Sequence, residues 1–132
     1  MSNRLALSLS AALSFCCAEA ALAHHSYGMF DRQKQQVLSG VVKTFDWTNP
    51  HSRIALIVPT QSGSSDLWDI ELGPPGQLIR SGWKRLSLKP GDKVQATVNP
   101  LRDGRPGGHL VRVVTADGQI LGDVIFDKPP PG

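Results

Sequence analysis

The sequence predicts an all-β domain with one short helix, a small five- to six-stranded OB-like Greek-key barrel that follows a cleaved N-terminal signal peptide. Two observations predict this fold class. Apolar and polar residues alternate over several short segments that are separated by turns rich in glycine and proline, which is typical of strands. A single helical segment falls between the third and fourth strands, as it does in OB barrels. Another small β-barrel or a β-sandwich is the alternative.

The chain opens with the composition of a secretory signal. Polar residues that include Arg4 precede an apolar run ending at Cys17, and Ala21-Leu22-Ala23 follows, which is the order of n-region, h-region and cleavage site in exported proteins. The apolar run is shorter than the ~18 residues that span a bilayer. Phe15 before Cys16 does not fit the small residue of a lipoprotein site. We therefore expect a periplasmic protein without a stable membrane anchor.

Cleavage after Ala23 makes His24 the first residue of the mature chain and removes both cysteines of the sequence. No disulfide can then form in an oxidising compartment, so stability has to come from the hydrophobic core. The mature chain is long enough for one domain and too short for two. The net charge of +3 is small and the basic residues are scattered, so we expect no nucleic-acid partner. The sequence makes no prediction of the oligomeric state.

The expected organisation is a signal peptide (1–23), an extended N-terminal arm (24–36), an OB-like barrel (37–122) and a proline-rich tail (123–132). Strands are expected at 37–48, 52–58, 66–72, 93–98 and 109–115, with a short further run at 119–121. Gly40 is expected to bend the first strand.

The helix is expected over 75–81, because proline suits a first helical turn and Gly82 suits the C-terminal end. Leu78, Ile79 and Trp83 should close one end of the core, and Trp68 should lie within it.

Four segments carry a pattern that is more specific than strand alternation. They are Ala23-His24-His25-Ser26, Leu38-Ser39-Gly40-Val41-Val42, Trp47-Thr48-Asn49-Pro50-His51 and Pro90-Gly91-Asp92-Lys93-Val94. This pattern resembles an exported bacterial family of unknown function, domain of unknown function 6152. The resemblance covers nearly all of the mature chain, and its Asn-Pro-His element is the most specific part. It implies export and a small β-barrel, and it implies no activity.

The most informative chemical feature is that all four histidines, His24, His25, His51 and His109, lie after the predicted cleavage site. A mature N-terminal His24 can chelate Cu(II) through its α-amine and its ring, and a histidine from the fold can complete the site. We expect His51 and His109 to lie in loops that flank the binding face of an OB barrel. A copper or zinc site is therefore one hypothesis. The alternative is a flexible arm and a turn capped by His51, because compact ligand spacing is absent from the sequence.

Five further residues near the same loops are candidates for ligand binding: Trp47, Asn49, Arg53, Arg102 and Arg105. Arginine side chains beside exposed glycine amides can hold a carboxylate or a phosphate, so an anionic small molecule or peptide is one prediction. A solvated hairpin loop is the alternative. An exposed tryptophan could stack against a ring of the ligand.

Familiar catalytic motifs are missing from the sequence. The predicted mature chain has no cysteine and no Gly-x-Ser-x-Gly segment, and Asp69 and Glu71 are expected to be solvated on the polar face of a strand. The sequence therefore favours a non-enzymatic periplasmic binding module that recognises a small molecule or an envelope protein through the loops around His51 and His109. A copper or zinc protein is the alternative.

Overall fold

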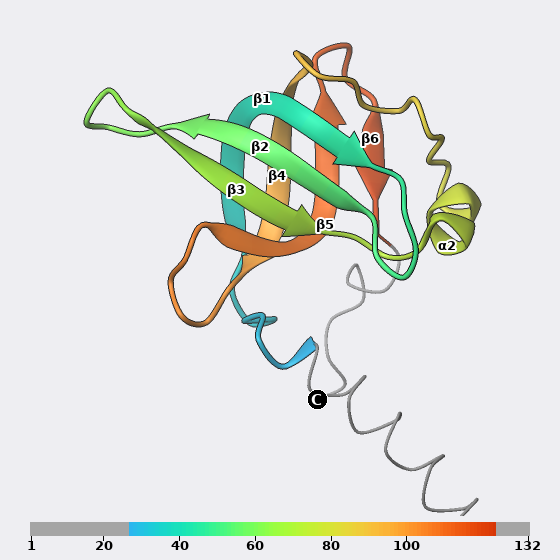
Figure 1. Cartoon of the computed structure of the whole chain (residues 1–132), viewed down its shortest axis with the longest axis horizontal. Coiled ribbons are helices and arrows are strands. Elements are labelled where there is room, and N and C mark those ends of the chain that lie inside the picture. Colours follow the sequence, from blue (N-terminus) through green and yellow to red (C-terminus); the bar gives the residue numbers. More distant parts are fainter. Residues whose placement is uncertain (1–26, 124–132) are drawn as a thin grey trace, which may run out of the picture.

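The computed structural model describes residues 27–123, which form a β-barrel with one short helix (Figure 1). The elements are β1 (Gln36–Asp46), β2 (Arg53–Pro59), β3 (Ser65–Glu71), α2 (Pro75–Arg80), β4 (Lys93–Pro100), β5 (Gly107–Thr115) and β6 (Ile120–Gly122). The predicted fold class, all-β with one helix, is confirmed. Each predicted strand lies within a few residues of an observed one.

Five strands close the barrel. Antiparallel pairing gives the order β3-β2-β1-β4-β5-β6, and a parallel pairing of β3 with β5 joins the two ends. This closing contact pairs Asp69 with Gly107 and Glu71 with His109. The sixth strand, β6, extends the sheet beyond β5. The order and the helix between β3 and β4 are compatible with the predicted OB-like topology.

The first strand bends so that it can pair with two neighbours. Val41 pairs with Lys93 of β4 and also with Ile57 of β2, and the strand is visibly curved in Figure 1. A Cβ on Gly40 would lie 2.5 Å from the carbonyl oxygen of Ile57, closer than atoms of that kind approach. β1 is curved as predicted (Figure 1), and the absence of a side chain at Gly40 allows the close approach of β2.

Alternating residues of the strands fill the barrel. Ile54 and Leu56 of β2 and Ile70 of β3 have no solvent exposure, because successive strand residues point to opposite faces. Trp68 is also buried, as predicted. These side chains belong to a single cluster that extends to the helix end of the barrel.

Helix α2 and the residue stretch after it close one end of this core. Leu78 and Trp83 are buried as predicted, and the Trp83 indole Nε1 donates to the carbonyl of Gly122 at 2.9 Å. The expectation for Ile79 was wrong, since this side chain is 60% exposed. A six-residue helix that packs with one face turns Leu78 inward and its neighbour outward.

The described part of the N-terminal arm is attached to the barrel. Phe30 is 3% exposed and forms a bridge with Leu101, and the Asp31 amide donates to the Pro100 carbonyl at 2.8 Å. The predicted signal peptide lies outside the described residues. No helix within residues 27–123 is both long enough and apolar enough to cross a membrane.

The barrel packing extends to Asp123, which the sequence analysis assigned to the tail. Its side chain is fully buried, and its amide donates to the Val111 carbonyl at 3.0 Å. The remaining tail, residues 124–132, lies outside the described part of the chain.

Candidate functional site

Titratable side chains gather at the barrel end where β3 finishes and the N-terminal arm crosses. We call Tyr27, His51, Glu71, His109 and Asp123 the polar cluster. They come from the arm, the β1–β2 loop, the end of β3, the start of β5 and the residue after β6. The parallel pairing of Glu71 with His109 brings the cluster together.

The first contact in the polar cluster joins His51 to Glu71. Nδ1 of His51 lies 3.2 Å from Oε1 of Glu71, and the two side chains are 25% and 12% exposed. Both atoms are buried and neither has a hydrogen bond of good geometry. The expectation that Glu71 is solvated was therefore wrong. Its strand ends against the β1–β2 loop, which covers the carboxylate.

The β1–β2 loop holds His51 in this position. The Asn49-Pro50 peptide bond is cis, and the Thr48 hydroxyl donates to the carbonyl of His51 at 3.1 Å. The next residue, Ser52, donates its amide to the Gly73 carbonyl at 3.1 Å. These contacts place His51 beside the end of β3.

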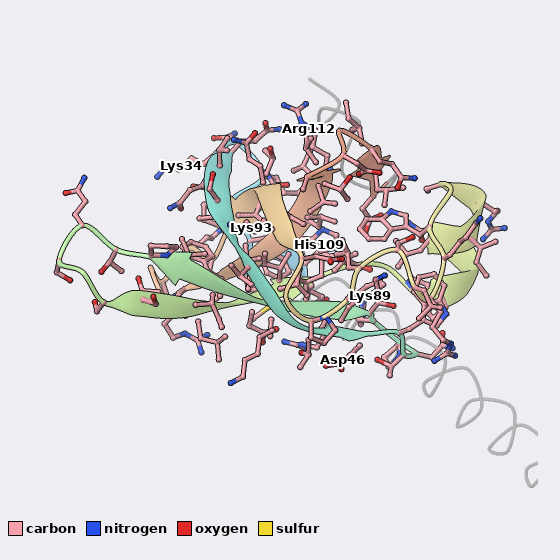
Figure 2. The ribbon with its side chains drawn as sticks, turned by 90° about the horizontal axis from the view of Figure 1, so that it is seen from above. Lys34, Asp46, Lys89, Lys93, His109 and Arg112 are labelled. Carbon is pink, nitrogen blue, oxygen red and sulfur yellow. The ribbon has the colours of Figure 1, made fainter. Side chains whose placement is uncertain are left out.

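His109 is, with Asp123, one of the two fully buried members of the polar cluster. It has no solvent exposure and lies inside the barrel, whereas Lys34 and Arg112 lie on the outside (Figure 2). Because a carbonyl oxygen can only accept, the ring donates from Nδ1 to the Leu110 carbonyl at 3.1 Å. Nε2 lies 4.0 Å from the carboxylate of Asp123.

Burial lowers the pKa of His109 to about 4, because a charged ring loses its hydration in the barrel. The hydrogen bond to Leu110 acts in the opposite direction and raises the pKa, whereas the positive charges of His51 and Arg32 lower it. The ring is therefore neutral at physiological pH.

The ring of Tyr27 contacts both histidines. Its ring centroid is 6.1 Å from that of His51 and 6.2 Å from that of His109. Burial raises the pKa of Tyr27, and the negative charges of Glu71 and Asp123 raise it further. The phenol therefore keeps its proton. The negative charges of Glu71 and Asp123 act on Tyr27 at this end of the barrel.

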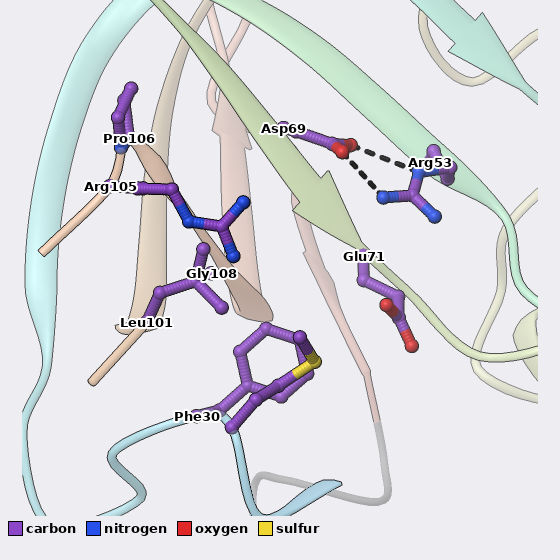
Figure 3. Close-up of a pocket in the computed structure, with 9 residues that line it drawn as sticks. Phe30, Arg53, Asp69, Glu71, Leu101, Arg105, Pro106 and Gly108 are labelled. Carbon is purple, nitrogen blue, oxygen red and sulfur yellow. Dashed lines mark hydrogen bonds and ion pairs between the residues drawn. The ribbon is translucent and has the colours of Figure 1, made fainter. Parts of the chain in front are cut away.

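A pocket opens beside the polar cluster, with a volume of about 360 Å³. Its lining residues, most of which Figure 3 labels, are Met29, Phe30, Arg53, Asp69, Glu71, Leu101, Arg105, Pro106 and Gly108. Glu71 belongs both to the pocket and to the polar cluster. The pocket therefore combines an apolar surface with a few charged groups.

Both arginines of the pocket are paired with carboxylates. Arg53 makes two hydrogen bonds to Asp69, of which the bond from Nε measures 3.0 Å. Arg105 donates from Nε to Asp103 at 2.8 Å. Figure 3 shows the Arg53–Asp69 pair beside Glu71, with Arg105 across the pocket.

The other predicted site residues lie elsewhere. Arg102 is not among the lining residues of the pocket, and instead donates to the Gly28 carbonyl at 3.1 Å and so holds the arm. Trp47 is partly buried and packs against Phe45, with ring centroids 5.7 Å apart. Asn49 is exposed. His24 and His25 lie outside the described residues.

Three members of the site were not predicted as site residues. Tyr27 was expected only as part of the N-terminal arm, Glu71 as a solvated residue and Asp123 as part of the tail. The hydrophobic pattern contains no signal for them, because their neighbours come from distant parts of the chain. Among residues 27–123, no group of three or more His, Cys, Asp or Glu side chains is arranged to hold a metal ion.

The family model described as Family of unknown function (DUF6152) matches residues 12–110. The chain belongs to this family. The DUF6152 match includes His51, Glu71 and His109 and ends before Asp123. No curated protein and no solved structure matched the chain.

Proposed function

We propose that this DUF6152 protein is exported to the periplasm and acts there as a non-enzymatic binding module for a small molecule. The observation that carries the proposal is the pocket of about 360 Å³ beside the polar cluster. Its volume falls in the range of roughly 300–1,000 Å³ that is common for small-molecule sites.

The composition of the pocket supports a ligand site. Phe30 and Leu101 provide apolar surface, and Glu71 provides a carboxylate. At Gly108 a Cβ would lie 2.7 Å from the carbonyl oxygen of Asn99, so this wall of the pocket stays free of a side chain. Apolar walls with a few placed polar groups are typical of sites for small ligands.

Residues of the polar cluster already make hydrogen bonds to the rest of the barrel. These structural roles support binding rather than catalysis. His109 donates to a backbone carbonyl. Asp123 accepts from the Gly73 amide at 2.7 Å and from Gln77 at 3.0 Å. These contacts hold the barrel end together. Burial raises the pKa of Tyr27, so the phenol keeps its proton and is a weaker acid than an exposed tyrosine.

Export is tested by expressing the full-length chain in a bacterial host and sequencing the N-terminus of the periplasmic protein. We expect the mature chain to begin at His24. Recovery of the protein in the cytosol, with Cys16 and Cys17 still attached, would contradict export.

Ligand binding is tested by screening small molecules by NMR with the mature protein. We expect chemical-shift changes at Phe30 and Gly108. Met29, which lines the pocket, is 43% exposed, so Met29→Trp should block binding. Leu67→Trp is the matched control, because Leu67 is 49% exposed and is not among the residues that line the pocket. Shifts that survive Met29→Trp would place the ligand elsewhere. If no small molecule binds in the pocket, the alternative is that the protein binds an envelope protein through another face.

A copper or zinc site is the second candidate, and the contact between His51 and Glu71 favours it. A carboxylate that takes up one nitrogen of a histidine orients the other nitrogen toward a metal. Tyr27 lies against His51 and follows His24 by three positions in the chain, so covalent geometry keeps the two Cα atoms within about 11 Å. The α-amine and ring of His24 could therefore join His51. His25 and His109 complete the predicted ligand set, although both nitrogens of His109 face protein atoms.

Metal analysis of the mature protein tests this candidate. We expect one equivalent of Cu(II) or Zn(II), lost in His51→Ala and when one residue is added before His24. His109→Leu should retain the metal, because both nitrogens of His109 face protein atoms. Metal-free protein with an intact His24 terminus, which also fails to take up added Cu(II) and Zn(II), would contradict the metal site.

A further inference from the structure

We infer that the ligand of this pocket is a cation, an ammonium or amidinium group on a compact apolar body. The inference rests on the proposed function, because it names the chemical class that the proposed pocket selects. It differs from the anion that arginine residues alone would suggest.

The arginines of the pocket give little support to an anion. Arg53 is bound by Asp69 through two hydrogen bonds, and Arg105 is bound by Asp103. An anionic ligand would therefore meet arginines whose charge is already balanced by a carboxylate. Each arginine and its partner together contribute no net charge at the rim of the pocket.

Glu71 is the lining charge that no arginine or lysine neutralises within ion-pair distance among the described residues. Its ion pair is with His51, which is charged only when protonated. Its side chain is 12% exposed, and Oε1 receives no hydrogen bond. Oε1 is itself buried against His51, so the pocket side of the carboxylate is where a ligand would bind. A largely buried carboxylate without an arginine or lysine partner is unfavourable, and an ammonium group in the pocket would supply both the positive charge and N–H donors.

The surroundings of Glu71 suit the apolar part of such a ligand. Phe30 and Met29 line the pocket together with Glu71, and Figure 3 shows Phe30 at the bottom of the pocket between Leu101 and Glu71. Aromatic faces attract cations, and the methionine side chain adapts to a small apolar group. Burial is the main cause of the raised pKa of Tyr27, and the negative charges of Glu71 and Asp123 raise it further.

Three matched probes test the inference on the mature protein: benzylamine, benzoate and benzyl alcohol. They share one apolar body and differ in charge. We expect benzylamine to bind at least tenfold more tightly than either of the others, with NMR shifts at Phe30 and Gly108. Added salt should weaken benzylamine binding, because the attraction is electrostatic. The buffer contains a chelator, so that a bound metal does not contribute.

Two charge-changing variants identify the residue that makes the selection. Glu71→Gln should lower the affinity for benzylamine about tenfold. Asp66→Asn is the matched control, because Asp66 is exposed on the same strand and the change in net charge is equal. Arg105→Gln removes a positive charge from the rim and should raise the affinity two- to threefold. If Glu71→Gln does not fold, the affinity of Arg105→Gln for benzylamine tests the inference.

The possible results separate the inference from the proposed function. Tighter binding of benzoate at the same residues would overturn the cation and leave the binding module standing. Equal binding of benzyl alcohol and benzylamine would do the same. If no probe shifts the pocket residues, while the screen described above finds ligands there, the cation is wrong. If the screen also finds none, both proposals fail.

Discussion

Nδ1 of His51 lies 3.2 Å from Oε1 of Glu71, although one residue precedes β2 and the other ends β3. The two strands are paired in register, with Arg53 opposite Glu71, and His51 lies just beyond this pair. The contact is therefore a consequence of strand register and of the loop that holds His51. It connects the pocket to the polar cluster, because Glu71 belongs to both.

Acidification should destabilise the protein through His109. Its pKa is lowered to about 4 in the fold and is about 6.5 in the unfolded chain. Above about pH 6.5 the His109 ring is neutral in both the folded and the unfolded state, so its protonation does not reduce the stability. As the pH falls below 6.5, the unfolded state takes up a proton and the folded state does not. We expect a loss of about 2 kcal/mol between pH 7 and pH 5.

Urea denaturation at several pH values measures this loss. His109→Leu should remove most of the pH dependence of the unfolding free energy. The other histidines are present in both proteins, so the difference between the two proteins isolates the contribution of His109. An unchanged pH dependence in the variant would show that another group is responsible.

Asp123 should contribute strongly to stability. Its carboxylate accepts hydrogen bonds from the Gly73 amide and from Gln77, and the side chain is fully buried. Asp123→Ala leaves these donors without a partner and should cost about 2–4 kcal/mol. The exposed Asp66 provides the control, since Asp66→Ala should change stability by no more than about 0.5 kcal/mol. Equal urea midpoints for the two variants would contradict this role.

Replacing Gly40 by alanine should destabilise the protein. A Cβ would lie 2.5 Å from the Ile57 carbonyl oxygen, so β1 and β2 would have to separate at the bend. We expect Gly40→Ala to cost about 2–4 kcal/mol. At Gly76 in α2 a Cβ meets no atom within 4 Å, and Gly76→Ala should stabilise the protein by about 0.5 kcal/mol. Thermal unfolding of both variants checks the opposite signs.

Adjacent residues of α2 should differ in their importance. Leu78 is fully buried, whereas Ile79 is 60% exposed. Leu78→Ala should cost about 2–4 kcal/mol because it leaves a cavity at the end of the core. Ile79→Ala should cost less than about 0.5 kcal/mol. If chemical denaturation gives similar costs, the orientation of the helix is not as described.

The sequence by itself determined the strands, the bend at Gly40 and the position of the helix. These features depend on local alternation of apolar and polar residues and on glycine and proline at turns, which can be read along the chain. Leu78 and Ile79 show where local reading ends. Both are apolar, and the packing direction of a short helix decided which one is buried.

Only the tertiary structure decided the site. Closure of the barrel by β3 and β5 paired Glu71 with His109, and the chain after β6 brought Asp123 to the same end. The burial of a carboxylate depends on which distant segments cover it, whereas the residue pattern of its own strand marks it as solvated. The strands could therefore be predicted from local sequence, and the polar cluster beside the pocket could not.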